Sequence, residues 1–345
     1  MVQKCDNVIT DRQTDRQTDR QTDKNISSEC SQSLKGILAV CVLMHHLYLC
    51  SGLFRETIIG GILQIAGYLS VACFFFLSGY GLYASYSIQG NTYIKSFPRR
   101  KILPFYCIIL FFSMIYFVER LILGQNFTVG ELIKSITFGG SIIANGWYLQ
   151  VQLLIYSLFY ITFRLTKSDK LSIIMISVEC IFMCVIMYAL DFSSTWHESV
   201  LAFPLGMIWY NLLSHKTVCK KKYIYFTWSV FEFVLFVATL IGYRKMNGPI
   251  NSLLFKMASA VLFTVFVATV INIINLNNKL TRWLGKYSLE IYIIQGVFLN
   301  LFHSRIIYIK NPYIYVIVVT ALVIATSIIL YPVTRKFYSL ARKSG

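Results

Sequence analysis

Charged residues are scarce in this chain of 345 residues: they make up 14% of it, against 56% for hydrophobic residues. A soluble globular domain needs more charge than this to cover its surface. The shortage therefore argues against a soluble globular protein. The mean hydropathy of +0.61, together with 26 Phe and 23 Tyr, is typical instead of a polytopic membrane protein.

Paired cysteines are missing as well. None of the nine cysteines belongs to a C-x-x-C pattern, so the sequence predicts neither a metal site nor a disulfide framework.

No cleavable signal peptide is expected, because the first 33 residues are polar. The first apolar run is expected to direct membrane insertion.

Ten apolar segments follow one another along the chain. Several are shorter than the ~20 residues of an upright transmembrane helix, so the set carries more weight than any one boundary. The basic residues that give the chain its net charge of +17 lie between these segments rather than on one basic face. For this reason no nucleic acid partner is predicted. The segments are 34–50, 62–88, 103–118, 146–163, 171–190, 199–213, 223–243, 253–276, 287–302 and 313–332.

The basic residues are distributed unequally over the connections. If the N-terminus is inside, the inner connections carry about three times as many lysines and arginines as the outer ones. The expected fold is therefore an all-α integral membrane protein, a bundle of about ten transmembrane helices with both termini in the cytoplasm. We expect a disordered polar tail at 1–33, a membrane domain at 34–332 and a basic cytoplasmic tail at 333–345.

The polar tail contains a strict four-residue repeat, TDRQTDRQTDRQTD, at positions 10–23. It has no apolar residue to bury and is expected to be disordered. A repeated GACA unit in the DNA encodes Asp-Arg-Gln-Thr in any frame, and the loss or gain of one unit shifts the downstream frame. We therefore hypothesise that slippage switches expression on and off, which sequencing of sibling colonies tests; an inert translated repeat is the alternative.

The first apolar segment reads K-G-I-L-A-V-C-V-L-M-H-H from Lys35 to His46. Ionisable side chains inside a membrane are costly and indicate a functional site. On a helix, Lys35 and His46 share a face about 16 Å apart, whereas His45 is rotated away from that face by about 100°. A neutral imidazole at this depth suits a general base. The alternative is a structural histidine, whose ring nitrogens hydrogen-bond to a polar group of a neighbouring helix.

This segment resembles the first membrane helix of the membrane acyltransferase-3 family, and the motifs that follow it resemble later parts of the same family. The family generally has Arg where Lys35 stands. The resemblance implies that His46 is catalytic, either as a general base or as a transient carrier of the acyl group, together with Lys35. It also implies that His45 is a possible supporting residue. Because Lys lacks the planar fork of Arg, any bidentate contact at this position is lost.

Three further segments resemble motifs of the same family in the same order. Phe74–Tyr80 contains Ser78 before a glycine, a step that lets helices approach closely. Asn145–Leu149 contains Trp147, which an interfacial aromatic anchor would also explain. Leu284–Tyr292 contains Ser288. The resemblance suggests supporting roles for Ser78, Trp147 and Ser288; Gln295, which follows the last motif, stands where the family usually has His.

The segment Phe97–Pro104 resembles the basic cytoplasmic loop of the family. Its residues Arg99, Arg100 and Lys101 suit a phosphate-rich ligand such as coenzyme A, because cationic groups match phosphate oxygens. The positive-inside rule alone would also place these charges here.

The resemblance implies a membrane O-acyltransferase of the bacterial inner (plasma) membrane. Its donor would be acetyl-CoA or another acyl-CoA, with no bound cofactor. Its acceptor would be a hydroxyl of a surface glycan such as lipooligosaccharide, capsule or exopolysaccharide. A transporter or flippase for a glycan or lipid-linked precursor is the alternative, and the departures at Lys35 and Gln295 leave an inactive family member open.

Other charges in or near the apolar segments have two readings. Glu179, Glu232 and Glu290 either pair with a cation on another helix or are protonated. The short outer connection before the sixth segment contains Asp191, His197 and Glu198, which either meet a sugar or belong to a solvated loop.

Overall fold

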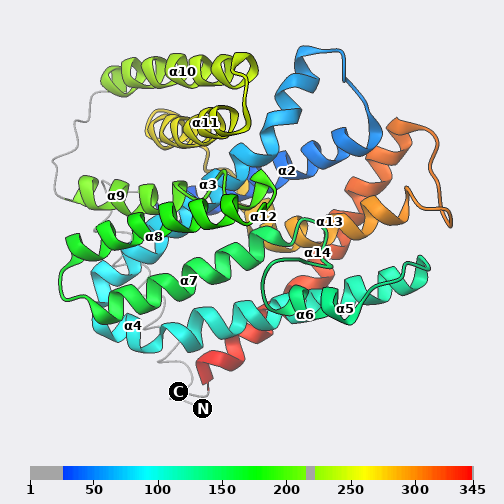
Figure 1. Cartoon of the computed structure of the whole chain (residues 1–345), viewed down its shortest axis with the longest axis horizontal. Helices are drawn as coiled ribbons and strands as arrows, with labels where there is room; N and C mark the ends of the chain where they lie inside the picture. Colours follow the sequence, from blue (N-terminus) through cyan, green and yellow to red (C-terminus); the bar gives the residue numbers. More distant parts are fainter. Residues whose placement is uncertain (1–25, 215–221, 344–345) are drawn as a thin grey trace.

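The computed structural model of the protein describes residues 26–214 and 222–343, and every element in these ranges is a helix (Figure 1). The repeat at positions 10–23 lies outside the described residues. The helices are α2 (Ser28–Ser51), α3 (Ile58–Gln89), α4 (Asn91–Phe97), the π-helix η1 (Pro98–Ile102), α5 (Leu103–Ile122), α6 (Val129–Ile136), α7 (Trp147–Leu165), α8 (Asp169–Ala189), the 3-10 helix η2 (Ser194–Trp196), α9 (Ala202–Ser214), α10 (Lys222–Lys245), α11 (Pro249–Val270), α12 (Lys279–Lys286), α13 (Ser288–Leu301) and α14 (Pro312–Lys343).

Seven helical segments of the described chain are long and apolar enough to cross a membrane: α2, α3, the run α4–η1–α5, α8, α10, α11 and α14. They coincide with seven of the ten expected segments. The other three fall on α7, α9 and α13, which have 19, 13 and 14 residues. These are shorter than the ~20 residues of an upright span. The chain is thus a multi-pass, all-helical membrane protein.

The boundaries of the two expected tails differ from those of the helices. Helix α2 begins at Ser28, inside the segment 1–33 that was expected to be a tail. Helix α14 runs on to Lys343, through most of the segment 333–345. The apolar stretches of α2 and α14 are therefore each extended by polar turns of the same helix.

Successive helices alternate in direction, so that their ends form two groups. In Figure 1 the α3–α4 and α7–α8 connections lie at the left, and the α2–α3 and α13–α14 connections lie at the right. A hydrogen bond of 3.0 Å from Tyr86 to Asp169 joins the end of α3 to the start of α8. Ser28 of α2, Ile88 of α3 and Arg335 of α14 line one cavity. The helix ends that carry the basic connections thus lie together.

Helix α2 has well-defined ends. The Ser27 hydroxyl caps its start by accepting a hydrogen bond of 3.1 Å from the amide of Cys30. At its other end the chain turns at Gly52, whose φ of 68° lies in the left-handed region that favours glycine. The sequence itself therefore fixes the ends of the helix that carries Lys35 and His46.

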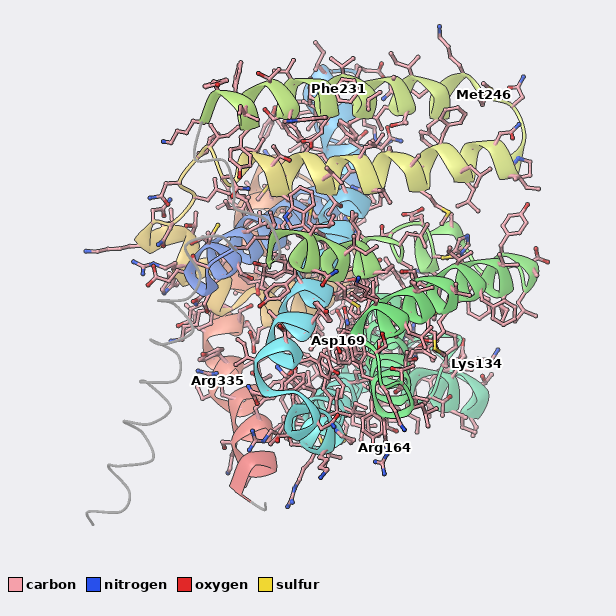
Figure 2. The ribbon with its side chains drawn as sticks, turned by 90° about the vertical axis from the view of Figure 1, so that its left-hand side faces the viewer. Lys134, Arg164, Asp169, Phe231, Met246 and Arg335 are labelled. Atoms are coloured by element: carbon pink, nitrogen blue, oxygen red, sulfur yellow. The ribbon has the colours of Figure 1, made fainter. Side chains whose placement is uncertain are left out.

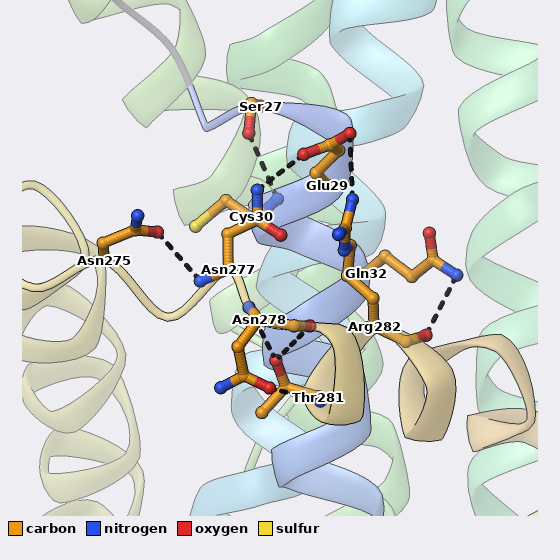
Figure 3. Close-up of polar contacts among 9 residues, drawn as sticks. All are labelled: Ser27, Glu29, Cys30, Gln32, Asn275, Asn277, Asn278, Thr281 and Arg282. Atoms are coloured by element: carbon orange, nitrogen blue, oxygen red, sulfur yellow. Dashed lines mark hydrogen bonds and ion pairs between the residues drawn. The ribbon is translucent and has the colours of Figure 1, made fainter.

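Polar contacts hold the start of α2 against α12 (Figure 3). The Glu29 carboxylate pairs with Arg282 at 3.2 Å and accepts a hydrogen bond of 2.5 Å from the Asn277 amide. The Gln32 amide donates to the Arg282 carbonyl at 3.2 Å. The Glu29 side chain is 52% exposed, so the ion pair adds little stability and mainly orients the two helices.

Two glycines let the backbones of α2 and α12 touch. A Cβ atom on Gly36 would lie 2.4 Å from the carbonyl oxygen of Thr281, and one on Gly285 would lie 1.8 Å from the carbonyl oxygen of Gln32. Any side chain at either position would push the helices apart. The glycines of the Lys-Gly and Leu-Gly-Lys motifs thus have a direct packing role.

The Ser-Gly step of α3 packs in the same way. A Cβ atom on Gly79 would lie 2.0 Å from the carbonyl oxygen of Phe203, and one on Gly206 would lie 2.1 Å from that of Phe76. Helices α3 and α9 are therefore in backbone contact. This agrees with the expectation that the small residue after Ser78 permits close helix packing.

Replacing Gly285 by alanine is expected to lower the thermal stability of the protein. The added methyl group meets backbone rather than a flexible side chain, and overpacking of this kind costs about 1–3 kcal/mol. The matched control is Gly81→Ala on α3, where a Cβ atom meets nothing within 4 Å. Thermal unfolding of the detergent-purified proteins should show a lower midpoint for Gly285→Ala only; equal midpoints would contradict the packing role.

Helices α10 and α11 form an outer hairpin. Figure 2 shows α10 as the outermost helix, with Phe231 on it and Met246 just beyond its end. Only 11% of the apolar stretch of α10 is buried within the protein. In a membrane protein such an apolar face contacts lipid, whereas α11 lies between α10 and the bundle and contacts α3.

Candidate functional site

The two residues of the opening motif lie on α2 but line different cavities. Lys35 lines a cavity of about 510 Å³, here called the lysine cavity. His46 lines a cavity of about 250 Å³, here called the histidine cavity. Tyr292 of α13 lines both cavities. The two cavities are thus adjacent, with one buried tyrosine between them.

The lysine cavity brings together four residues that the sequence analysis singled out. They come from four different elements: Lys35 from α2, Ser78 from α3, Lys101 from η1 and Ser288 from α13. Lys35 and Lys101 are half-buried. The cavity therefore combines two cations with hydroxyl groups.

A chain of polar side chains crosses the wall of the lysine cavity. The Gln152 amide donates to the Ser78 hydroxyl at 3.1 Å, and Ser78 donates to the Tyr156 hydroxyl at 3.4 Å. The Tyr148 hydroxyl donates to the Gln152 carbonyl oxygen at 3.4 Å. Ser78 is thus a member of a polar network as well as part of the α3–α9 packing step.

A basic vestibule of about 720 Å³ adjoins the lysine cavity and shares Lys35 with it. Lys286 of α12 and Arg335 of α14 also line it. Both lie over the ring of Tyr331, with the cationic groups 4.7 Å and 5.4 Å from the ring centre. Three cations from three helices therefore converge at this opening.

The basic run of η1 does not act as a unit. Lys101 lines the lysine cavity, but Arg100 is exposed. Arg99 is exposed too and lines a separate groove with Tyr106 and Leu103. Of the three residues predicted to bind the donor, the structure brings only Lys101 next to Lys35.

The histidine cavity brings together His45, His46 and Trp147, with Glu198 and Lys256. The expectation that His45 faces away from the site is wrong, because both histidines line this cavity. Their rings lie edge to face with centres 5.0 Å apart. The cavity is lined by Val42, His45, His46 and Leu49, which are spaced so that they share one face of α2, and this face is wide enough to include both histidines.

The orientation of His45 is fixed on two sides. Its Nδ1 donates a hydrogen bond of 2.8 Å to the carbonyl oxygen of Leu63, which leaves Nε2 as the unprotonated nitrogen of a neutral ring. A Cβ atom on Gly67 would lie 2.6 Å from Nε2, so that only glycine leaves room for the ring. His46, by contrast, has no hydrogen-bond partner among the described residues and is half-buried.

A buried ion pair forms part of the same cavity. Lys256 Nζ lies 2.6 Å from Glu198 Oε2, and these side chains are 18% and 2% exposed. The ammonium group also lies over the rings of Tyr68 and Tyr243, 5.1 Å and 5.9 Å from the ring centres. Glu198 thus belongs to the cavity wall, and its assignment to a solvated loop is wrong.

His197, next to Glu198, is also buried rather than solvated. It is 1% exposed, and neither ring nitrogen has a partner among the described residues. Burial lowers the pKa of His197, whereas the nearby Glu198 carboxylate opposes this shift. His197 is therefore neutral at physiological pH and does not line the histidine cavity.

The start of α7 is anchored so that it closes the histidine cavity. The Gln150 amide nitrogen lies within 2.7–2.9 Å of the carbonyl oxygens of Lys134, Ser135 and Gly140. Asn145, just before α7, has a positive φ of 58° and lines the cavity together with Trp147. Trp147 therefore has a position in the cavity wall.

Tyr292 is held firmly between the two cavities. Its hydroxyl donates to the Asn145 carbonyl oxygen at 3.0 Å, and its ring lies 5.1 Å from that of Tyr148. Gln295, one turn later, is fully buried and donates to the Tyr292 carbonyl oxygen at 2.9 Å. Gln295 thus supports the helix turn that carries Tyr292 and lines neither cavity.

The three glutamates singled out in the apolar segments are partnered by threonines. Glu179 accepts a hydrogen bond of 2.7 Å from Thr162, and Glu232 accepts one of 3.0 Å from Thr269. Glu290 accepts one from Thr334. Within the described residues none of the three pairs with a cation, so these carboxylates link neighbouring helices.

Several residues of the site were not singled out from the sequence. Tyr148 and Tyr292 belong to the family-like segments that contain Trp147 and Ser288. Their place in these segments was a usable signal. For Glu198 the sequence leaves open both a sugar contact and a place in a solvated loop. Lys286 also belongs to the segment Leu284–Tyr292. The remaining residues lie outside the family-like segments and carried no signal: Gln152, Tyr156, Lys256 and Arg335.

The site therefore combines a cationic opening, a polar cavity and a second cavity with two imidazoles. A family model described as an acyltransferase domain matches residues 31–332, which contain all of these residues except Arg335. No curated protein and no solved structure matches the chain.

Proposed function

The chain belongs to the acyltransferase-3 family and is a membrane acyltransferase, and we propose that it transfers an acetyl group from acetyl-CoA to a hydroxyl of a cell-surface glycan. The observation that supports this proposal is the pair of adjacent cavities. One has cations at its opening, and the other contains His45 and His46. A donor with an anionic end and an acceptor with a hydroxyl would then meet near Tyr292.

In this proposal the phosphates of coenzyme A bind in the basic vestibule. Lys35, Lys286 and Arg335 supply charge-assisted hydrogen bonds to phosphate oxygens. Lys101 extends this positive region into the lysine cavity. Arg99 and Arg100 lie outside both cavities and attract the anionic donor to this face over a longer range.

The acyl group then extends through the lysine cavity towards Tyr292. His46 removes the proton of the acceptor hydroxyl, whose oxygen attacks the thioester carbonyl carbon. The carbon–sulfur bond breaks, and the coenzyme A thiolate takes the proton from the His46 imidazolium. The products are an O-acyl ester and free coenzyme A thiol. His45, oriented by Leu63, supports the neighbouring imidazole.

The proposed topology has ten membrane helices, with both termini in the cytoplasm of a bacterial cell and the protein in its inner membrane. This topology is supported by the helix ends with basic connections, which lie together on one side of the bundle. Lysine and arginine favour the cytoplasmic side of a membrane. The basic vestibule then opens to cytoplasmic acetyl-CoA. The repeat at positions 10–23 supports phase-variable expression as part of the same proposal.

A comparison of surface glycans tests the reaction. Cells that express the gene should contain glycan with an additional acetyl group, and cells without it should not, as measured by mass spectrometry of lipooligosaccharide, capsule and exopolysaccharide. The purified protein in liposomes should release coenzyme A thiol only when acetyl-CoA and deacetylated glycan are both present. Glycans of equal mass but altered amount at the surface would instead support a transporter.

A further inference from the structure

We infer that Glu198 and Lys256 together determine acceptor specificity, by binding adjacent hydroxyls of a neutral sugar ring in the histidine cavity. This inference rests on the proposed function. Both side chains line that cavity together with His46, so that a sugar held by them has a hydroxyl near the imidazole. Glu198 comes from the connection before α9 and Lys256 from α11.

The burial of the ion pair indicates a role beyond stability. Removing two charges from water carries a large cost in free energy, and the attraction between them often does no more than offset this cost. Glu198 is 2% exposed and lies 2.6 Å from Lys256. A buried pair at the wall of a cavity is therefore better explained by a ligand than by the stability of the fold.

The ammonium group is held in place before any ligand binds. Besides Glu198, it contacts the faces of Tyr68 and Tyr243. The Tyr68 hydroxyl is itself hydrogen-bonded to Ser259 at 2.9 Å. Because the position of Lys256 is already fixed, little conformational entropy is lost when a ligand binds to it.

The pair retains hydrogen-bonding capacity for a ligand. A carboxylate has about four acceptor sites, and Lys256 is the one partner of Glu198 among the described residues. An ammonium group has three donors, and Lys256 uses one for Glu198 and a long one of 3.5 Å for Ser194. A sugar hydroxyl both donates and accepts, so that adjacent hydroxyls fit a carboxylate beside an ammonium group.

The size and charge of the cavity narrow the ligand further. A volume of about 250 Å³ corresponds to roughly eight waters, which suits one sugar ring rather than several. Trp147 offers an aromatic wall for the apolar face of such a ring. Glu198 and Lys256 cancel in charge, so the pair gives no net attraction to a sugar carboxylate.

The test uses purified protein in liposomes, acetyl-CoA, and surface glycan extracted from cells that lack the gene. Mass spectrometry should locate the new acetyl group on a neutral sugar, and chemical reduction of the uronic acids in the glycan should leave the rate unchanged. Acetylation of an acidic sugar would overturn the inference. A wild-type protein that acetylates no sugar would instead contradict the proposed function.

Substitution of the pair tests which residues are responsible. Glu198→Gln is expected to raise the KM for the glycan about tenfold or more, the effect of losing one charged hydrogen bond, with the KM for acetyl-CoA within about twofold of wild type. Asp191→Asn, an exposed carboxylate of the same connection, is the matched control and should change neither value. An unchanged glycan KM in Glu198→Gln would overturn the inference.

A double variant separates specificity from stability. Glu198→Gln combined with Lys256→Met removes both charges and leaves no unpaired ion, so it should insert in the membrane even where the single variant does not. If the pair determines specificity, the glycan KM remains raised in the double variant while acetyl-CoA still binds. Recovery of the wild-type glycan KM would show a structural role and overturn the inference.

Discussion

Replacing His46 by alanine is expected to reduce the turnover number for acetyl transfer by about 10²- to 10⁴-fold, the contribution of a positioned general base. His46 lines the histidine cavity and has no hydrogen-bond partner among the described residues, so that its imidazole is available to an acceptor hydroxyl. Coenzyme A release by liposome-embedded protein, with saturating acetyl-CoA and glycan, measures the effect. Because the donor binds elsewhere, its KM should change little.

Two control variants identify the cause of this loss. His303→Ala removes a histidine of the α13–α14 connection, which lines neither cavity, and should leave turnover unchanged. His45→Ala removes the oriented neighbour and should give a smaller loss than His46→Ala. Turnover retained by His46→Ala at normal expression would exclude His46 as the base, and a larger loss in His45→Ala would transfer that role to His45.

The helices and the order of the motifs could be predicted from the sequence because both depend on residues close together in the chain. Hydropathy located seven long apolar helices, and the spacing of Lys35 and His46 placed both on α2. Hydropathy could not show how far α7, α9 and α13 extend across the membrane. The lengths of these helices depend on the elements that pack around them.

The contacts between distant helices could not be predicted. Consecutive residues of a helix point in different directions, so that Arg99 and Lys101 of the π-helix η1 line different cavities, although their shared charge suggested a common site. The ion pair of Glu198 and Lys256 depends on how α11 packs near the α8–α9 connection. Nothing in the local sequence of either residue indicates the other.

Lys35 is the residue for which the structure sharpens the prediction most. It lines both the basic vestibule and the lysine cavity, and no other lysine or arginine does so among the described residues. In the proposed mode of donor binding, a cation at this junction reaches the donor where its phosphates end and its acyl-bearing arm begins. Its proposed role is therefore donor binding, whereas the transfer step belongs to the histidine cavity.

Replacing Lys35 by methionine is expected to raise the KM for acetyl-CoA about ten- to hundredfold, because one hydrogen bond between charged groups contributes about 1.5–3 kcal/mol. Lys35→Arg keeps the charge and should retain a KM near that of wild type. Arg99→Ala should have a smaller effect than Lys35→Met, since Arg99 lines a separate groove. Donor saturation curves at fixed glycan measure all three; a larger effect at Arg99 would place the phosphates on η1 and remove Lys35 from the donor site.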